Sequence, residues 1–162
     1  MILYINLLPA GPVQTLENFY ELNHIRYELN VAWNRWQSHS FSNYSFDFHG
    51  EAFSNCFMYY SDQANLIIRN GSLFTVTVPS DSHIRDVSNW LHSCNYEDYL
   101  PEQMFQHIER VLSEIDPLQT YLRVEFNPEY GYVTRYRSGC YYPVSDCGTT
   151  LTFDNFNFAE AK

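Results

Sequence analysis

The sequence predicts an α+β fold, in which two main helices pack on one face of an antiparallel sheet. Apolar residues recur at helical spacing in two segments, and residues that alternate in polarity follow each of them. Short turns that contain Gly join these strands, as is typical of antiparallel hairpins. The predicted order of elements is therefore helix, strands, helix, strands.

The first helix is expected over residues 15–38. Thr15 is a candidate N-cap, because its hydroxyl can accept a hydrogen bond from a backbone N–H of the first turn. Apolar side chains recur mostly every three or four residues and so fall on one helix face: Phe19, Leu22, Ile25, Leu29, Ala32, Trp33 and Trp36. This face is expected to enter the core.

The first strands follow directly. NYSFDFHG, residues 43–50, alternates aromatic and polar side chains, which predicts a strand with one buried face. NLIIRNGSLFTVTVP, residues 65–79, predicts a hairpin at Asn70 and Gly71, because a type I′ turn needs positive φ at both central positions. Over residues 80–100 the pattern breaks up, and we expect a long loop held by Cys94, with one short helix near residues 87–91.

The second helix is expected to begin with Pro101 at its first position and to end before Pro117. Its apolar residues keep a clear helical register: Met104, Phe105, Ile108, Val111, Leu112 and Ile115. We expect one core between the helices and the sheet that contains Leu29, Trp33, Trp36, Phe105, Ile108 and Leu112.

The last strands form a second hairpin. Leu122, Val124 and Phe126 alternate with charged residues and lead into a turn over residues 128–131. In the return strand, period-two alternation predicts Tyr132, Thr134 and Tyr136 on one face and Val133, Arg135 and Arg137 on the other. TTLTFDNFNF, residues 149–158, completes the set of strands.

Length and charge limit the function. The 162 residues fit one domain, residues 1–162, in which residues 1–14 are either the remnant of a leader or an edge segment. A net charge of −10 argues against a nucleic-acid partner, which requires a basic face. No apolar run is long enough to cross a bilayer, so we expect no transmembrane segment.

The cysteines favour disulfides over a metal site. Cys56, Cys94, Cys140 and Cys147 are even in number and contain no C-x-x-C pair. We expect Cys140 to pair with Cys147 and, by elimination, Cys56 with Cys94. Disulfides would imply an oxidising compartment, whereas free thiols are the alternative.

The common catalytic signatures are absent, and we predict no catalytic residues, no cofactor and no metal site. Binding is the better hypothesis. Tyr141 and Tyr142 lie on a loop that the Cys140–Cys147 bridge would preorganise, and Tyr130 and Tyr132 come from the adjoining turn. These tyrosines form either a contact surface or a merely stapled loop.

Three arginines suggest a second feature. Arg135 and Arg137 share one strand face, and with Arg123 opposite them they would form a small anion-binding patch. The alternative is cross-strand pairing with Glu125 and Glu129.

Several motifs resemble those of an uncharacterised bacterial family of exported proteins and lipoproteins. They are WNRWQSHSFSNYSFDF, LIIRNGSLFTVTV, MFQHIERVL, LRVEFNPEYGYVTRYR and LTFDNFNF, and the resemblance covers residues 31–158. This chain departs from the family where Val133 replaces the proline of a Tyr-Gly-Tyr-Pro turn and where SGCYYPVSDC replaces an acidic residue. The resemblance implies export and a compact α+β fold, and it implies no activity.

The sequence therefore predicts a secreted, periplasmic or envelope-associated binding module without catalytic activity, whose partner is a protein or another extracellular macromolecule. The alternative is a small-ligand pocket or a weak hydrolase with its site between the helices and the sheet.

Overall fold

The computed structural model describes residues 12–52, 62–78, 95–141 and 147–158. Within these ranges the chain forms two α-helices, a short 3₁₀ helix and six strands, in the predicted order of helix, strands, helix, strands. In chain order they are α1 (Pro12–His39), β1 (Tyr44–Ala52), β2 (Asp62–Arg69), β3 (Ser72–Thr77), η1 (Tyr96–Tyr99), α3 (Pro101–Glu114), β4 (Thr120–Phe126), β5 (Val133–Cys140) and β6 (Gly148–Phe158). The predicted α+β class is confirmed.

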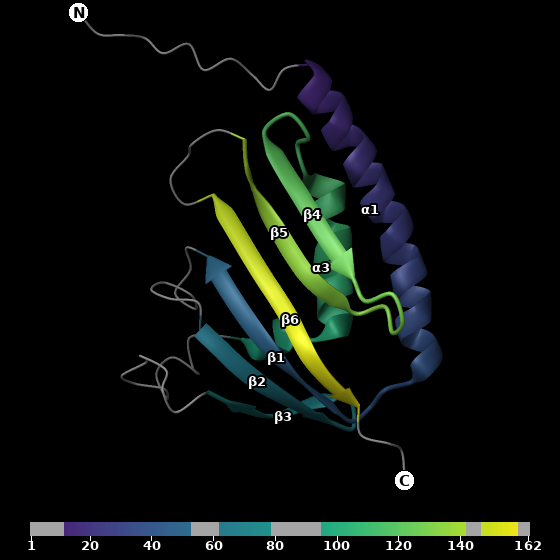
Figure 1. Ribbon diagram of the computed structural model, residues 1–162, viewed down its shortest axis with the longest axis vertical. Coiled ribbons are helices and arrows are strands. Elements are labelled where there is room, and N and C mark those ends of the chain that lie inside the picture. The colour runs from purple at the N-terminus through teal and green to yellow at the C-terminus, as the bar shows by residue number, and fades with distance from the viewer. Residues whose placement is uncertain (1–11, 53–61, 79–94, 142–146, 159–162) are drawn as a thin grey trace, which may run out of the picture.

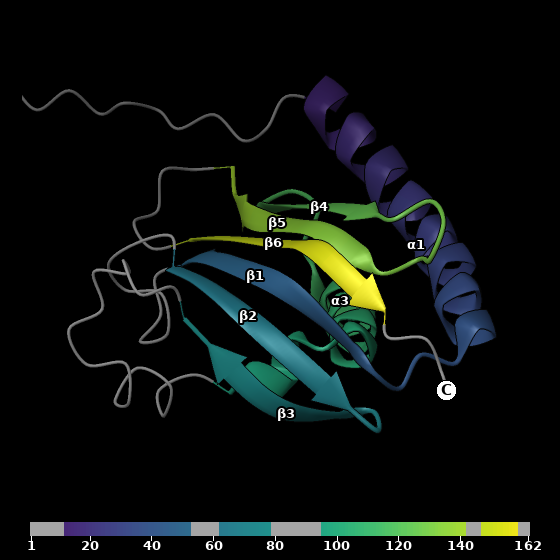
Figure 2. The ribbon, with the colours of Figure 1, turned by 60° about the horizontal axis from the view of Figure 1, so that its bottom comes forward.

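The described strands form one antiparallel sheet in the order β3-β2-β1-β6-β5-β4. Each helix is thus followed by three strands that pair in sequence, and the two units join where β1 lies beside β6. Figure 1 looks onto one face of the sheet, with α3 behind the strands and α1 along the β4 edge. Figure 2 shows α3 beneath the sheet, so the opposite face is left open by both helices.

The core lies between α1, α3 and one face of the sheet. From α1 it receives Leu22, Ile25, Leu29, Ala32 and Trp36, and from α3 it receives Met104, Phe105, Ile108 and Leu112. The predicted register of both helices is confirmed at these positions, as is Pro101 at the start of α3. Of the predicted core set, Trp33 is only partly buried and packs against this core.

The prediction for Phe19 is wrong. Its side chain is 47% exposed, because the preceding residue, Asn18, takes the inward position at that turn of α1. The Asn18 amide nitrogen donates to the carbonyl oxygens of Pro117 at 2.6 Å and Thr120 at 3.1 Å. A polar side chain therefore ties the beginning of α1 to the connection between α3 and β4.

The predicted faces of β5 are wrong at one residue. The pairing with β4 shifts register between Glu125 and Phe126, which pairs with Val133, and this irregularity turns Val133 into the core. A β-bulge of this kind interrupts the period of two that the sequence argument assumed. Beyond it the prediction is confirmed, since Tyr136 is buried while Arg135 and Arg137 are exposed.

Both predicted turns are present. Asn70 and Gly71 have φ of 53° and 74°, as expected for the turn between β2 and β3. In the turn between β4 and β5, the Asn127 side-chain oxygen accepts from the backbone N–H groups of Glu129 and Tyr130 at 2.9 and 2.8 Å. Gly131 follows with φ of 89°, and a Cβ atom there would collide with the backbone carbonyl of Ala32 in α1. Only glycine fits this position.

An aromatic cluster surrounds that turn. The Trp36 ring contacts five other rings, those of Phe41, Tyr44, Tyr132, Phe156 and Phe158. Its Nε1–H donates to the Glu102 carboxylate at 2.8 Å, so the indole has a polar partner at the first turn of α3. The cluster joins both helices to β1, to β6 and to the turn that precedes β5.

We predict that Gly131→Ala destabilises the protein far more than Gly71→Ala. Both residues have positive φ, which costs about 1 to 2 kcal/mol for an alanine, but at Gly71 no atom lies within 4 Å of the added methyl group. At Gly131 the clash with α1 adds about 1 to 3 kcal/mol. Urea unfolding of the two variants measures the difference, and equal losses would show that the turn does not pack against α1 in this way.

Candidate functional site

A hollow lies between α3 and the strands β5 and β6, where two small polar residues, Ser138 and Thr149, occupy positions that face the helix. On the face of β5 and β6 that looks toward α3, Tyr136 pairs with Leu151, and two positions further on Ser138 pairs with Thr149. Residues two apart on a strand share a face. The side chains that face α3 therefore change along these strands from large ones, Tyr136 and Leu151, to small ones, Ser138 and Thr149. Side chains of this size leave space between the strands and α3.

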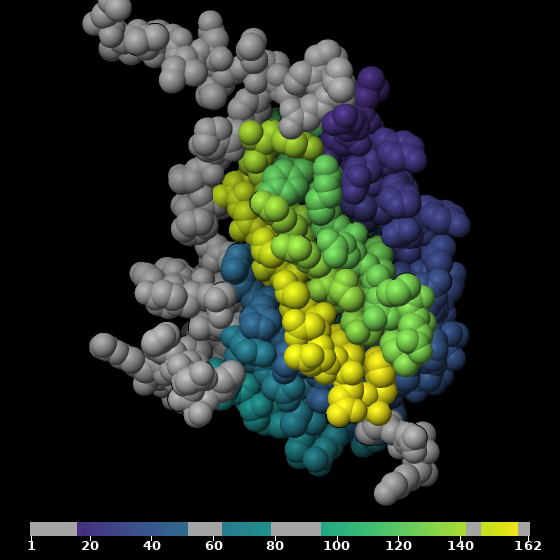
Figure 3. Space-filling view, in the orientation of Figure 1, coloured from purple at the N-terminus to yellow at the C-terminus, as the bar shows by residue number. Residues whose placement is uncertain are grey.

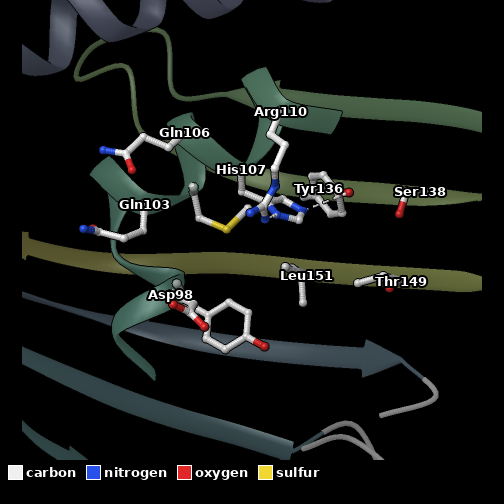
Figure 4. Close-up of a pocket in the computed structure, with 11 residues that line it drawn as sticks. Asp98, Gln103, Gln106, His107, Arg110, Tyr136, Ser138, Thr149 and Leu151 are labelled. Atoms are coloured by element: carbon white, nitrogen blue, oxygen red, sulfur yellow. Dashed lines mark hydrogen bonds between the residues drawn. The ribbon is translucent and has the colours of Figure 1, made fainter. Parts of the chain in front are cut away.

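The space is a cavity of about 650 Å³. η1 contributes Asp98 and Tyr99, and the strands contribute Tyr136, Ser138, Thr149 and Leu151. From α3 come the polar side chains of Gln103, Gln106, His107 and Arg110 (Figure 4), together with the buried Met104. A second hollow of about 440 Å³ shares Tyr136, Ser138 and Thr149 with it and extends toward Cys147.

A chain of hydrogen bonds at the wall of the cavity joins α3 to β5. Arg110 Nη2 lies 3.2 Å from His107 Nδ1, and His107 Nε2 lies 3.2 Å from the Tyr136 hydroxyl oxygen (Figure 4). A guanidinium can only donate, so Nδ1 must accept, and the single proton of a neutral imidazole then lies on Nε2. His107 therefore donates to Tyr136, which leaves the phenolic hydrogen free for another acceptor.

The electrostatics agree with a neutral His107. Burial and the nearby Arg110 charge lower the pKa of His107, and Asp98 opposes them in part. Burial raises the pKa of Tyr136, against a smaller opposing effect of a hydrogen bond with Ser138. At neutral pH the chain thus consists of a cationic guanidinium, a neutral imidazole and a neutral phenol.

The residues predicted for binding are only partly brought together. Arg135, Arg137 and Tyr141 lie on the open side of the hairpin formed by β4 and β5, whereas Tyr130 and Tyr132 lie at the other end of β5. The strand β5 thus has Tyr130 and Tyr132 before its first residue and Tyr141 after its last, with the two arginines between them. Tyr132 is buried, with its ring stacked on Phe156 at 3.6 Å between centroids.

Tyr142 lies outside the described residues, as do Cys56 and Cys94. The Cys140–Cys147 disulfide is present, as predicted. The Tyr141 ring packs against Tyr121, 5.7 Å between centroids, and its hydroxyl is buried without a partner among the described residues. Whether Tyr141 binds anything stays a prediction.

Arginines gather on the open face of β4 and β5. Arg123 stands directly opposite Arg137 in the register, and Glu125 stands opposite Arg135. Arg137 lies over the Tyr121 ring at 5.8 Å, and Arg123 Nε lies 3.8 Å from a Glu21 carboxylate oxygen of α1. Among the described residues neither Arg135 nor Arg137 forms an ion pair. Figure 3 shows this side of β4, β5 and β6 as a continuous surface.

The cavity was not predicted from the sequence. His107, Arg110, Tyr136 and Ser138 carry no motif and lie on two elements that only the fold brings together. One signal was available: the polar residues of the second helix, from Gln103 to Arg110, lie on one flank beside its apolar face. The sequence does not show that Ser138 and Thr149 face these polar residues, because that depends on the pairing of β5 with β6.

The model of a family of unknown function, DUF6174, matches residues 28–158 of this chain. The chain belongs to this family. The predicted resemblance to an uncharacterised family is therefore confirmed over nearly the same residues. No curated protein and no solved structure matches the chain, so DUF6174 supplies no activity, ligand or partner.

Neither described helix contains an apolar stretch of the length that a membrane span requires. In the part of the chain that the structure describes, no three His, Cys, Asp or Glu side chains are placed to hold a metal ion.

We predict that His107 makes stability fall as the pH is lowered from 7 to 5. The folded-state pKa is lowered, so below the unfolded value of about 6.5 the unfolded chain binds more protons. The contribution of His107 is complete above that pH and is lost as the pH falls through the folded pKa. Urea midpoints across this range should therefore depend less on pH in His107→Gln than in the wild type.

The control is His24→Gln, because the His24 side chain is 53% exposed and lies on the outer surface of α1. This variant measures the effect of removing an imidazole that does not line the cavity. A His107→Gln profile that coincides with the wild-type profile would contradict the assigned neutral state.

Proposed function

We propose that this chain is a non-catalytic binding protein whose site is the cavity between α3 and the strands β5 and β6. The observation that carries the proposal is the hydrogen-bond chain from Arg110 through His107 to Tyr136, at the wall of a cavity of about 650 Å³. Cavities of this size with a few convergent polar groups are the usual form of small-molecule sites.

The same hydrogen bonds argue against hydrolysis. A general base needs an imidazole nitrogen that can take a proton from a nucleophile. In His107, Nδ1 accepts from Arg110 and Nε2 donates to Tyr136, so neither nitrogen is available to activate Ser138. Arg110 and His107 are arranged to orient the Tyr136 hydroxyl, which suits the binding of a ligand.

The cavity can be tested by filling it. Thr149→Leu places a larger apolar side chain on its floor, while Thr150→Leu makes the same change one residue later, where Thr150 pairs with Arg137 on the open face. We expect saturation-transfer NMR with a mixed library of neutral, anionic and cationic small molecules to find binders. Their signals should persist in Thr150→Leu and disappear in Thr149→Leu.

Neither variant should melt below the wild type, which is measured first. Binders that respond equally to the two changes, or a library without binders, would count against the cavity as the site.

A second candidate function is binding of an acidic macromolecule on the open face of β4 and β5. The specific observation is the direct opposition of Arg123 and Arg137. Like charges opposite each other on a sheet destabilise it, and a carboxylate that bridges two guanidinium groups would relieve the repulsion. The exposed guanidinium of Arg135 lies on the same face.

We expect a fluorescent octaglutamate peptide to bind this face at low salt despite the net charge of −10. Fluorescence anisotropy should show that Arg137→Glu abolishes binding, because it places a negative charge at the centre of the patch. Arg69→Glu makes the same charge change at the end of β2 and should leave most of the affinity. Equal effects of the two variants would indicate general electrostatics and not a site.

We also propose that the protein acts outside the cytoplasm, in the envelope or beyond it. The Cys140–Cys147 disulfide supports this, since such bonds persist in oxidising compartments. Fractionation of the cells that produce the protein, followed by thiol alkylation without reductant, should find it outside the cytoplasm with both cysteines protected. A cytoplasmic protein with both thiols labelled would refute the proposal.

A further inference from the structure

We infer that the ligand of this cavity is a neutral molecule rich in hydroxyl groups, such as a sugar or a sugar-like polyol. The inference rests on the proposed function and specifies the chemistry of the same site. It follows from the charges of the cavity walls, from the kinds of hydrogen-bonding groups on them and from the apolar side chains among them.

The charges of the lining cancel. Arg110 contributes one positive charge and Asp98 one negative charge, while the bonding of His107 keeps it neutral. Arg110 would repel a cationic ligand. Asp98 and the net charge of −10 would repel an anionic one. A ligand without net charge avoids both penalties.

The hydrogen-bonding groups are mixed. The amides of Gln103 and Gln106 and the hydroxyls of Ser138 and Thr149 can each donate and accept. Tyr136 is fixed as a donor toward the cavity side, because His107 occupies its oxygen as a donor. A hydroxyl group of a ligand can likewise donate and accept, so a polyol can pair with all of these groups.

An apolar ligand fits less well. It would displace water from these amides and hydroxyls without replacing the lost hydrogen bonds, at a cost of about 1 to 3 kcal/mol for each group left unpaired. Met104 and Leu151, both buried, supply a limited apolar surface beside the polar groups. Such a surface suits the C–H face of a sugar ring.

The test uses a panel of mono- and disaccharides that covers the common hexoses and pentoses, measured by saturation-transfer NMR and titration calorimetry. Benzoate, benzylamine and toluene serve as anionic, cationic and apolar probes. We expect at least one saccharide to bind more tightly than all three probes. Its affinity should fall at least tenfold in Tyr136→Phe, and Thr149→Leu should abolish binding.

Gln106→Ala gives a second measurement that does not depend on the buried Tyr136. Gln106 is exposed at the cavity, so this variant should fold normally and still lose affinity for the saccharide several-fold. Thr150→Leu is the matched control and should bind as the wild type does.

The outcomes separate the two proposals. A cavity that binds one of the three probes in preference to every saccharide, with binding lost in Thr149→Leu, overturns the ligand class and leaves the proposed function in place. If a saccharide binds equally well to Thr149→Leu and Gln106→Ala, its site is outside the cavity. This result also overturns the inference. If nothing in the panel or among the probes binds, both the ligand class and the cavity function fail.

Discussion

The contact between the β4–β5 turn and the backbone of α1 is the constraint on which the rest of the architecture depends. Gly131 lies against Ala32 so closely that no side chain fits, and Trp36, one helical turn later, packs against Tyr132 and Tyr44. The turn cannot move along the helix without breaking these contacts. The position of β5 relative to the helices is thereby fixed at this end.

The fixed position of β5 also determines which of its side chains line the cavity. The bulge beside Val133 sets the phase of the remaining residues, so that Tyr136 and Ser138 face α3 while Arg135 and Arg137 face away. The Trp36 indole also donates to Glu102, which places the first turn of α3 against the same cluster. His107 lies on this helix, and its meeting with Tyr136 depends on both placements.

Local patterns predicted most of the fold and little of the site. The α3 register and the Asn70-Gly71 turn follow from neighbouring residues alone, and both predictions were correct. Phe19 and Val133 failed because their placement depends on distant partners: the carbonyls that hold Asn18, and the bulge in the pairing with β4. The cavity depends on the pairing of Ser138 with Thr149 and on the helix above them, which no short stretch of sequence contains.

The two faces of the sheet carry different chemistry at the disulfide end. Arg123 and Arg137 stand on the open face, and Ser138 and Thr149 stand on the covered one. On the open face, charged side chains can reach solvent, and their presence alone requires no functional explanation. On the covered face, small polar residues interrupt a core that large apolar side chains could have filled.

This interruption has a stability cost, which makes the covered face the more informative of the two. Apolar residues of the size of Leu151 at positions 138 and 149 would extend the packed core toward α3, at a gain of about 1.5 to 3 kcal/mol for each fully buried side chain. The sequence has Ser138 and Thr149 there, and it surrounds them with Tyr136, His107 and Arg110, whose polar groups pair with one another. Departures from the most stable packing are expected where function requires a particular surface. A hollow with an ordered chain of hydrogen bonds at its wall is the departure that a binding site requires.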